Sequence, residues 1–206
     1  MSVCQEIRSI SADLSTPDLL RFLIVERFPG EVLVTASLKA RSVVVLKMVA
    51  DIDPATPVVF CRRGYQFPES DIYRERIVDL LGLKTVTQVE GHEVTVPPGD
   101  LDHSEHMWIE AESGPGRSYE IVHLNQTLAP YSCWISAVYH VPSPPHLTHR
   151  VDVEGRLIRI DPLIRWSRDD VRAFMREHGL PFHPRAASRV HKAPTEPQEL
   201  PSSYNY

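Results

Sequence analysis

The sequence of 206 residues predicts an α/β fold in which helices cover both faces of a parallel sheet. Three short apolar segments rich in valine and threonine, 31–36, 57–61 and 84–89, are typical of buried strands. Segments with helical spacing lie between them, and this alternation is the pattern of parallel strands joined by right-handed crossovers. We expect one domain over residues 1–184, and an extended or mobile tail over 185–206 that has too few apolar residues to fold alone.

Three helices are expected among these strands. The first covers 17–28, because Thr16 can cap a helix that has proline in its first turn. The apolar run 43–50 contains successive valines, which favour a strand, but a helix fits better because two parallel strands need a crossover between them. The third helix begins at Pro68 and ends at Gly82.

The second half of the chain is expected to contain an acidic, loop-rich stretch, two further strands and a last helix. Residues 84–120 carry two basic and eight acidic residues, and 13 of the 18 prolines follow residue 90. The segments 132–138 and 156–160 have the apolar pattern of strands. Ser167 and Asp170 have the spacing of a capping box, which marks the start of the last helix.

Composition excludes several classes of protein. The net charge of −5 gives no overall positive field, so bulk nucleic-acid binding is not expected. No apolar run has the length of a membrane span and the first residues lack the layout of a signal peptide, so we expect a cytoplasmic protein that does not contact a membrane. The three cysteines, Cys4, Cys61 and Cys133, form no CxxC pair and are too few for a disulfide framework.

Basic residues and serines follow the first two predicted strands. In an open parallel sheet, ligands bind beyond the carboxyl ends of the strands, and a helix start adds unpaired N–H groups and a positive dipole. If the two strands are neighbours, four positive charges lie on one rim and form a site for a phosphate- or sulfate-bearing ligand. The alternative is that these are ordinary solvated loop charges. The candidate residues are Ser37, Lys39, Arg41, Ser42, Arg62, Arg63 and Gly64.

Four segments, in order, resemble the phosphoadenosine phosphosulfate (PAPS) reductase family of the adenine-nucleotide alpha-hydrolase-like superfamily. Residues 57–70, PVVFCRRGYQFPES, look like the family's PVIFLDTGYxFPET, and residues 35–46 look like its modified phosphate loop. Residues 134–140 and 160–184 are similar to two later motifs. The resemblance implies a Rossmann-like fold, an adenine-nucleotide or sulfonucleotide ligand, and a lineage in sulfur assimilation.

The chain departs from the family at several positions that concern chemistry. The family's loop glycine is Lys39 here, and the aspartate and threonine of its LDTG motif are Arg62 and Arg63. The paired cysteines of cluster-bearing members align near Ser118 and Tyr119, so no iron–sulfur cluster and no other cofactor is expected.

Two further positions are candidates to replace ligands that the family has and this chain lacks. His140 stands where the family has an arginine, and Arg150 lies in the loop that follows; surface polar residues would give the same pattern. Cys61, beside two arginines, would have a lowered thiol pKa and could act as a substitute nucleophile, the alternative being a buried cysteine in place of the family's leucine.

No metal site is expected. Two HxxH pairs are present, but two ligands do not make a site and neither pair has a clear helical context. These pairs are His103 with His106 and His146 with His149.

Three hypotheses for the function remain open. Sulfonucleotide reductases of this family attack sulfur with a cysteine on a C-terminal tail, and this chain has no cysteine after Cys133, so the usual thiol-dependent chemistry is expected to be absent. The chain is then an atypical nucleotide-dependent transferase or hydrolase, or a redox-dead regulatory protein with a protein partner or a homo-oligomeric state. The third hypothesis is a reductase whose missing cysteine comes from another polypeptide.

Overall fold

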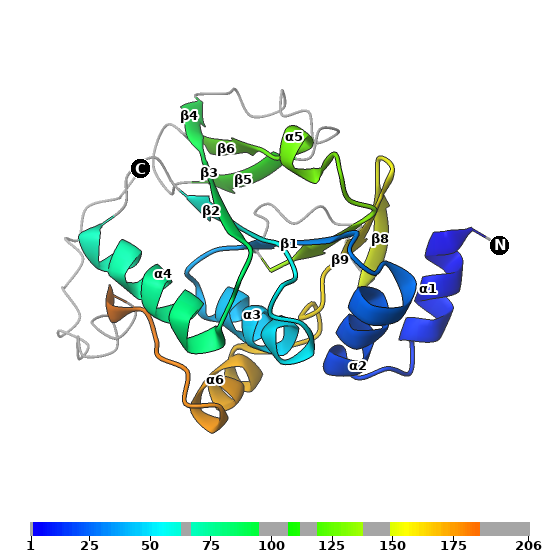
Figure 1. The fold of residues 1–206 in the computed structure, drawn as a ribbon, viewed down its shortest axis with the longest axis horizontal. Coiled ribbons are helices and arrows are strands. Elements are labelled where there is room, and N and C mark those ends of the chain that lie inside the picture. Colours follow the sequence, from blue (N-terminus) through cyan, green and yellow to red (C-terminus); the bar gives the residue numbers. More distant parts are fainter. Residues whose placement is uncertain (1, 63–66, 95–106, 112–118, 138–148, 186–206) are drawn as a thin grey trace, which may run out of the picture.

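The computed structural model describes residues 2–62, 67–94, 107–111, 119–137 and 149–185 (Figure 1). Its centre is a six-stranded sheet in the order β3-β2-β1-β7-β9-β8, which is parallel except for β8. The predicted fold class is thereby confirmed. The strands are β1 (Val32–Ala36), β2 (Val58–Arg62), β3 (Val86–Glu90), β7 (Cys133–Ser136), β8 (Val151–Glu154) and β9 (Leu157–Ile160).

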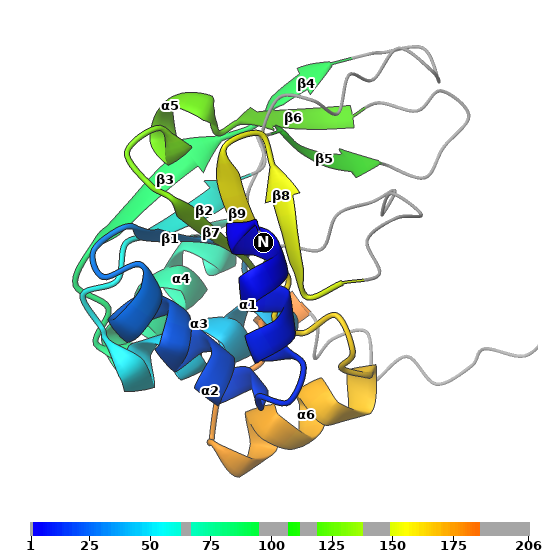
Figure 2. The same ribbon diagram turned by 90° about the vertical axis from the view of Figure 1, so that its right-hand side faces the viewer.

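Most helices lie on one face of this sheet (Figures 1 and 2). The central one is α3 (Ala40–Ile52), which contacts α2 (Thr16–Arg21), α4 (Pro68–Leu81) and α6 (Arg168–Glu177). Its successive valines are all buried, because the helix packs against the sheet on one side and contacts three other helices. The run that was ambiguous in the sequence is therefore a buried helix. Among the described helices, none has the length and apolar character needed to cross a membrane.

The opposite face of the sheet is covered differently. A short helix, α5 (Asn125–Leu128), buries Leu124 and Leu128 in a second core cluster with residues of β1, β2 and β7. Beside it lies a three-stranded antiparallel sheet in the order β4-β6-β5 (Figure 1). The expectation of a loop-rich stretch was wrong here. The added strands are β4 (His92–Val94), β5 (Met107–Ala111) and β6 (Tyr119–His123).

Helix boundaries follow the capping chemistry closely. The helix predicted over 17–28 is α2 with a π-helical continuation, η1 (Phe22–Arg27). Its cap is Ser15, whose Oγ accepts a hydrogen bond from the Asp18 amide at 3.2 Å, and not Thr16 as expected. The capping box predicted for α6 is present. The sequence did not signal the first helix, α1 (Val3–Ser11), or strand β8.

Candidate functional site

The carboxyl ends of β1 and β2 lie side by side. The two strands pair in parallel with Ala36 opposite Phe60, and β7 pairs in parallel on the other side of β1. The segments that leave these three strands therefore emerge at one edge of the sheet, where ligands bind in open parallel sheets. The central spatial prediction, that the first two strands are neighbours with their exits at a common edge, is confirmed.

Ser42 fixes the loop that leaves β1. Its buried Oγ donates to the carbonyl of Ala137 at 2.7 Å and accepts from the Ser37 amide at 3.0 Å. Because the only proton of Ser42 is used on Ala137, the 3.0 Å contact between the two hydroxyls requires Ser37 to donate. Ser37 Oγ in turn accepts from the Lys39 amide at 3.3 Å. Ser42, predicted as an anion ligand, is thus the residue that joins this loop to the end of β7.

The loop leads directly into the amino end of α3. Lys39 occupies the N-cap position with extended backbone and an exposed side chain. A lysine has no side-chain oxygen with which to cap the helix, and the first-turn N–H groups with the helix dipole make this end a positive pole. The helix therefore adds to the charge of Lys39 at the edge where β1 ends.

Arg62 brings a second positive charge to this edge from β2. Side chains alternate along a strand, so Arg62 shares the face of Phe60, which packs in the core on the α3 side. Its Nε lies 3.9 Å from Oε1 of Glu90, the residue opposite it on β3. The pair is partly exposed and long, so Glu90 binds the guanidinium only weakly.

Two of the predicted anion ligands are used elsewhere in the structure. Arg41 donates to the carbonyl oxygens of Trp166, at 3.0 Å, and Leu163, and so ties the start of α3 to the turn before α6. Arg150 donates to the carbonyl of Leu14 at 2.9 Å. Both guanidinium groups thus bind main-chain oxygen atoms of the protein itself, and their role in the structure is to join distant segments.

Cys61 is not activated. It projects from β2 into the second core cluster with 6% of its surface exposed, and burial raises the pKa of its thiol to about 12. The interpretation that neighbouring arginines lower this pKa disagrees with the structure, because burial desolvates the thiolate and raises the pKa. The alternative, a buried cysteine without a chemical role, agrees with the structure. Burial also raises the pKa of Cys133, and Cys4 is buried as well.

Several predicted residues lie outside the described residues: Arg63, Gly64, His140 and three of the four histidines of the HxxH pairs. The fourth, His149, is exposed. Within the described ranges, no cluster of three or more histidine, cysteine, aspartate or glutamate side chains could hold a metal ion.

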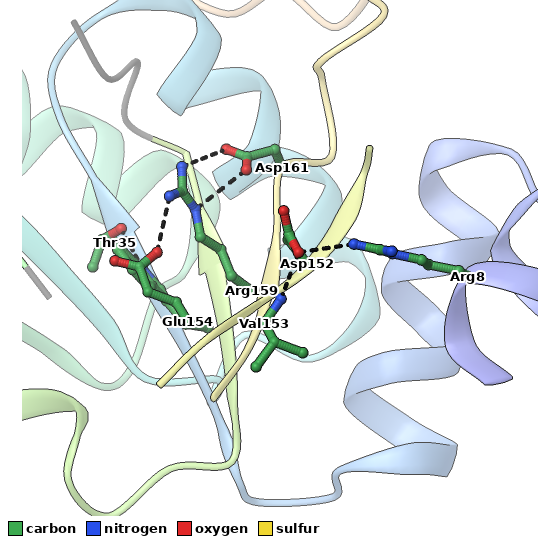
Figure 3. A network of polar contacts seen from close by, with 8 residues as sticks. Arg8, Thr35, Asp152, Val153, Glu154, Arg159 and Asp161 are labelled. Atoms are coloured by element: carbon green, nitrogen blue, oxygen red, sulfur yellow. Dashed lines mark hydrogen bonds and ion pairs between the residues drawn. The ribbon is translucent and has the colours of Figure 1, made fainter. Parts of the chain in front are cut away.

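A buried ion network, which the sequence did not reveal, joins the strands of the central sheet on the face opposite α3. Arg159 lies between Glu154, at 2.9 Å, and Asp161, at 3.2 Å (Figure 3). Its guanidinium carbon is 5.2 Å from the Trp134 ring centroid, and Trp134 Nε1 donates to Thr35 Oγ1 at 2.8 Å. Burial raises the pKa of Asp161 although Arg159 opposes the shift. The network thus connects β8, β9, β7 and β1.

A strap after α6, residues 181–185, packs on the start of α4 and was also not anticipated. Tyr73 donates its hydroxyl to the Pro181 carbonyl at 2.6 Å, and Arg185 lies 3.3 Å from Glu69. Nδ1 of His183 accepts from the Arg185 amide at 3.2 Å, so the neutral ring carries its proton on Nε2 and donates to Ser70 Oγ at 3.1 Å. In this tautomer His183 anchors Ser70 and cannot act as its general base.

The phosphoadenosine phosphosulfate reductase domain model matches residues 31–186. A phosphoadenosine 5'-phosphosulfate reductase of Alkalilimnicola ehrlichii is 24% identical over 161 residues, which cover 77% of this chain and 66% of that protein. An adenosine 5'-phosphosulfate reductase of Mesorhizobium japonicum is 29% identical over 163 residues, covering 79% of this chain and 63% of the relative. The chain thus spans slightly less than two thirds of these two relatives.

The fold is also found in a solved structure. The crystal structure of phosphoadenylyl-sulfate reductase from Candida auris, a phosphate complex, superposes with a TM-score of 0.60 at 14% identity and covers 94% of both chains. This likeness agrees with the adenine-nucleotide alpha-hydrolase-like fold. The region matched by the family model includes both strand exits, the loop held by Ser42 and the strap after α6. On that match the chain belongs to the phosphoadenosine phosphosulfate reductase domain family.

Proposed function

We propose that this chain binds an adenine nucleotide or a sulfonucleotide, such as adenosine 5'-phosphosulfate (APS) or PAPS, at the edge where β1 and β2 end. The observation that carries the proposal is the convergence there of Lys39, the amino end of α3 and Arg62. Fixed N–H groups and two cations suit a phosphate or sulfate group. The relatives named as reductases of APS and PAPS support a ligand of this class.

The residues divide into ligands and supports. Lys39, Arg62 and the Ser37 end of the loop are the described candidates for contact with the anion, and Arg63, Gly64 and His140 complete the proposed set. Ser42 does not contact the anion in this proposal; its buried hydroxyl fixes the conformation of the loop that does. Since Glu90 binds Arg62 weakly, an arriving phosphate or sulfate can replace it as the counter-ion.

We infer that binding, and not thiol-dependent reduction, is what these 206 residues accomplish unaided. A thiolate is needed to attack the sulfur of a sulfonucleotide. All three cysteines are buried, and burial raises the pKa of both Cys61 and Cys133. Reduction would then need a thiolate from outside these residues, and a reductase completed in that way is the second candidate function, favoured by the names of the relatives.

Thermal unfolding in the presence of ATP, AMP, APS or PAPS tests the binding proposal. A ligand at about 100 times its Kd stabilises the folded state by about 2.7 kcal/mol. We expect stabilisation by at least one of the four. Lys39→Gln and Arg62→Gln should each weaken that ligand about tenfold through loss of a charge-assisted hydrogen bond. Arg176→Gln, at an exposed position in the last turn of α6, is the matched control.

The two candidate functions differ in turnover. With reduced thioredoxin and APS or PAPS as the substrate, a binding protein releases no sulfite, whereas sulfite release would support the reductase. If none of the four nucleotides shifts the unfolding temperature, both are wrong.

A further inference from the structure

The first turn of α3 is held at two adjacent residues by two different parts of the chain. Ser42 bonds to the end of β7 through the Ala137 carbonyl. Arg41 bonds to the segment between β9 and α6, where its Nη1 donates to the Trp166 carbonyl at 3.0 Å and its Nη2 donates to the Leu163 carbonyl. Because α3 lies between the sheet and α6 (Figures 1 and 2), these contacts fix the start of the helix from both sides.

This first turn carries the main-chain amides that the proposed function assigns to the anion. The Val43 amide donates to the Lys39 carbonyl at 3.2 Å, which is the first main-chain hydrogen bond of the helix. The amides of residues 40–42 therefore precede the intrahelical ladder, and their direction follows the helix axis. A hydrogen bond weakens steeply when its donor is misaligned, so the affinity for an anion depends on how this end of the helix is oriented.

The turn that Arg41 contacts, residues 161–166, is itself attached to another helix. Thr16, a buried residue at the start of α2, donates its hydroxyl to the Pro162 carbonyl at 3.3 Å. The same hydroxyl oxygen accepts a hydrogen bond from Trp166 Nε1 at 3.2 Å. The turn is thus joined to α2 at two of its residues, and it can serve as a fixed support for α3.

The contact between Arg41 and this turn uses the shape of the guanidinium group more than its charge. Both acceptors are neutral carbonyl oxygens, and each receives an N–H group from a different nitrogen of the same planar side chain. A lysine ammonium carries the same charge but lacks the planar fork that holds two acceptors in one geometry. Arg41→Lys therefore separates the two properties, because it keeps the charge and loses the fork.

We propose that Arg41 is a positioning residue of the anion site, which directs the first-turn amides of α3 toward the phosphate or sulfate without contacting it. The inference rests on the proposed function, because that function places the anion at this end of α3. Arg41 then differs in role from Lys39, whose exposed side chain is a candidate ligand. The alternative, in which the Arg41 charge contacts the anion directly, makes different predictions in the experiments below.

Equilibrium binding, measured well below the unfolding temperature, tests this role. The probe is whichever of ATP, AMP, APS and PAPS stabilises the wild type most. Arg41→Lys and Arg41→Gln should each weaken its binding about tenfold, since residues outside the ligand contacts can change affinity by this order. Arg176→Lys, at an exposed position of α6, is the matched control and should bind as the wild type does.

Two outcomes of this measurement would overturn the proposal. Full affinity in Arg41→Lys, with a loss only in Arg41→Gln, would show that the charge itself contacts the anion. Full affinity in both variants, with a lowered unfolding temperature, would show that Arg41 stabilises the fold and has no effect on the site.

The dependence of binding on sodium chloride separates a positioning residue from a ligand. Salt screens the attraction between opposite charges, so loss of a cation that contacts the anion makes the dissociation constant less sensitive to salt. Lys39→Gln should show this reduced sensitivity. Arg41→Lys should lower the affinity and keep the sensitivity of the wild type, and a reduced sensitivity in this variant contradicts the proposal.

Hydrogen exchange tests the support in the absence of a nucleotide. In the unliganded protein, Arg41→Lys should speed exchange of the Val43 amide and of the Trp166 amide, which donates to the Leu163 carbonyl at 2.9 Å. Amides of α1 are the internal control. Unchanged exchange at both positions contradicts the positioning role, whereas failure of all four nucleotides to bind the wild type contradicts the proposed function.

The wild type supplies a measurement that needs no variant. Coupling between two sites is reciprocal, so the nucleotide that binds the wild type should slow exchange of the Trp166 amide as well as that of the Val43 amide. Slower exchange at Val43 alone would show that the turn before α6 is not coupled to the anion site.

Discussion

The hydroxyl group of one buried serine, Ser42, decides how the loop after β1 is held. Ser42 is fully buried, and its hydroxyl serves both the Ser37 amide and the Ala137 carbonyl. The sequence pointed to Ser42 as part of the site through its place at a helix start. It could not distinguish a ligand from a support, because that depends on Ala137, which is 95 residues away.

Ser42→Ala is expected to lower the free energy of unfolding by about 1–3 kcal/mol, since it leaves a part-buried amide and a buried carbonyl without their partner. Chemical denaturation measures this directly. Ser9→Ala, at an exposed position of α1, should leave stability nearly unchanged. Equal, small effects of both substitutions would show that the Ser42 hydroxyl does not hold the loop.

At the scale of elements, apolar runs, a first-turn proline and a capping box predicted β1, β2, β3, α3, α4 and α6. The expectation that the third strand is buried was wrong, because β3 lies at the edge of the sheet and its side chains are exposed or half-buried. Strands β4 to β6 were missed, since they lie in an acidic segment whose composition resembles that of loops. The strap after α6 was missed too: its contacts with Ser70 and Tyr73 join residues more than 100 positions apart.

The docking of this strap should depend on pH through His183. Burial lowers the pKa of His183 below its usual 6.5, and the charge of Arg185 acts in the same direction, while Glu69 opposes the shift. The pKa of Glu69 is itself lowered, and burial raises the pKa of the Tyr73 hydroxyl to about 12. The unfolded strap therefore binds a proton before the docked strap does, and protonation also removes the Nδ1 acceptor. The contribution of His183 is complete above pH 6.5 and declines as the pH falls below that value.

The measurement is the difference in unfolding free energy between wild type and His183→Ala. It should be about 1 kcal/mol near neutral pH and shrink as the solution is acidified. A difference that is constant, or that grows in acid, would contradict the neutral tautomer assigned here.

Across the whole molecule, the sequence predicted the neighbouring strand exits correctly, because the order of strands and helices constrains a parallel sheet strongly. It overestimated the number of arginines available to a ligand. Charge is visible in a sequence, but the carbonyl oxygens that occupy a guanidinium group are visible only after folding. Among the residues that the structure describes, four arginines donate to main-chain oxygens of distant segments: Arg8, Arg41, Arg150 and Arg156.

The main-chain hydrogen bonds of these four arginines have a consequence for tolerance of high ionic strength. Their acceptors are neutral, so dissolved ions, which screen attraction between opposite charges, leave them largely in place. A phosphate or sulfate held by Lys39 and Arg62 has no such protection. We expect about 1 M sodium chloride to abolish nucleotide binding while the unfolding temperature of the unliganded chain changes little. A large drop in that temperature on adding the salt would show that exposed ion pairs, and not the hydrogen bonds from arginines to main-chain oxygens, stabilise the fold.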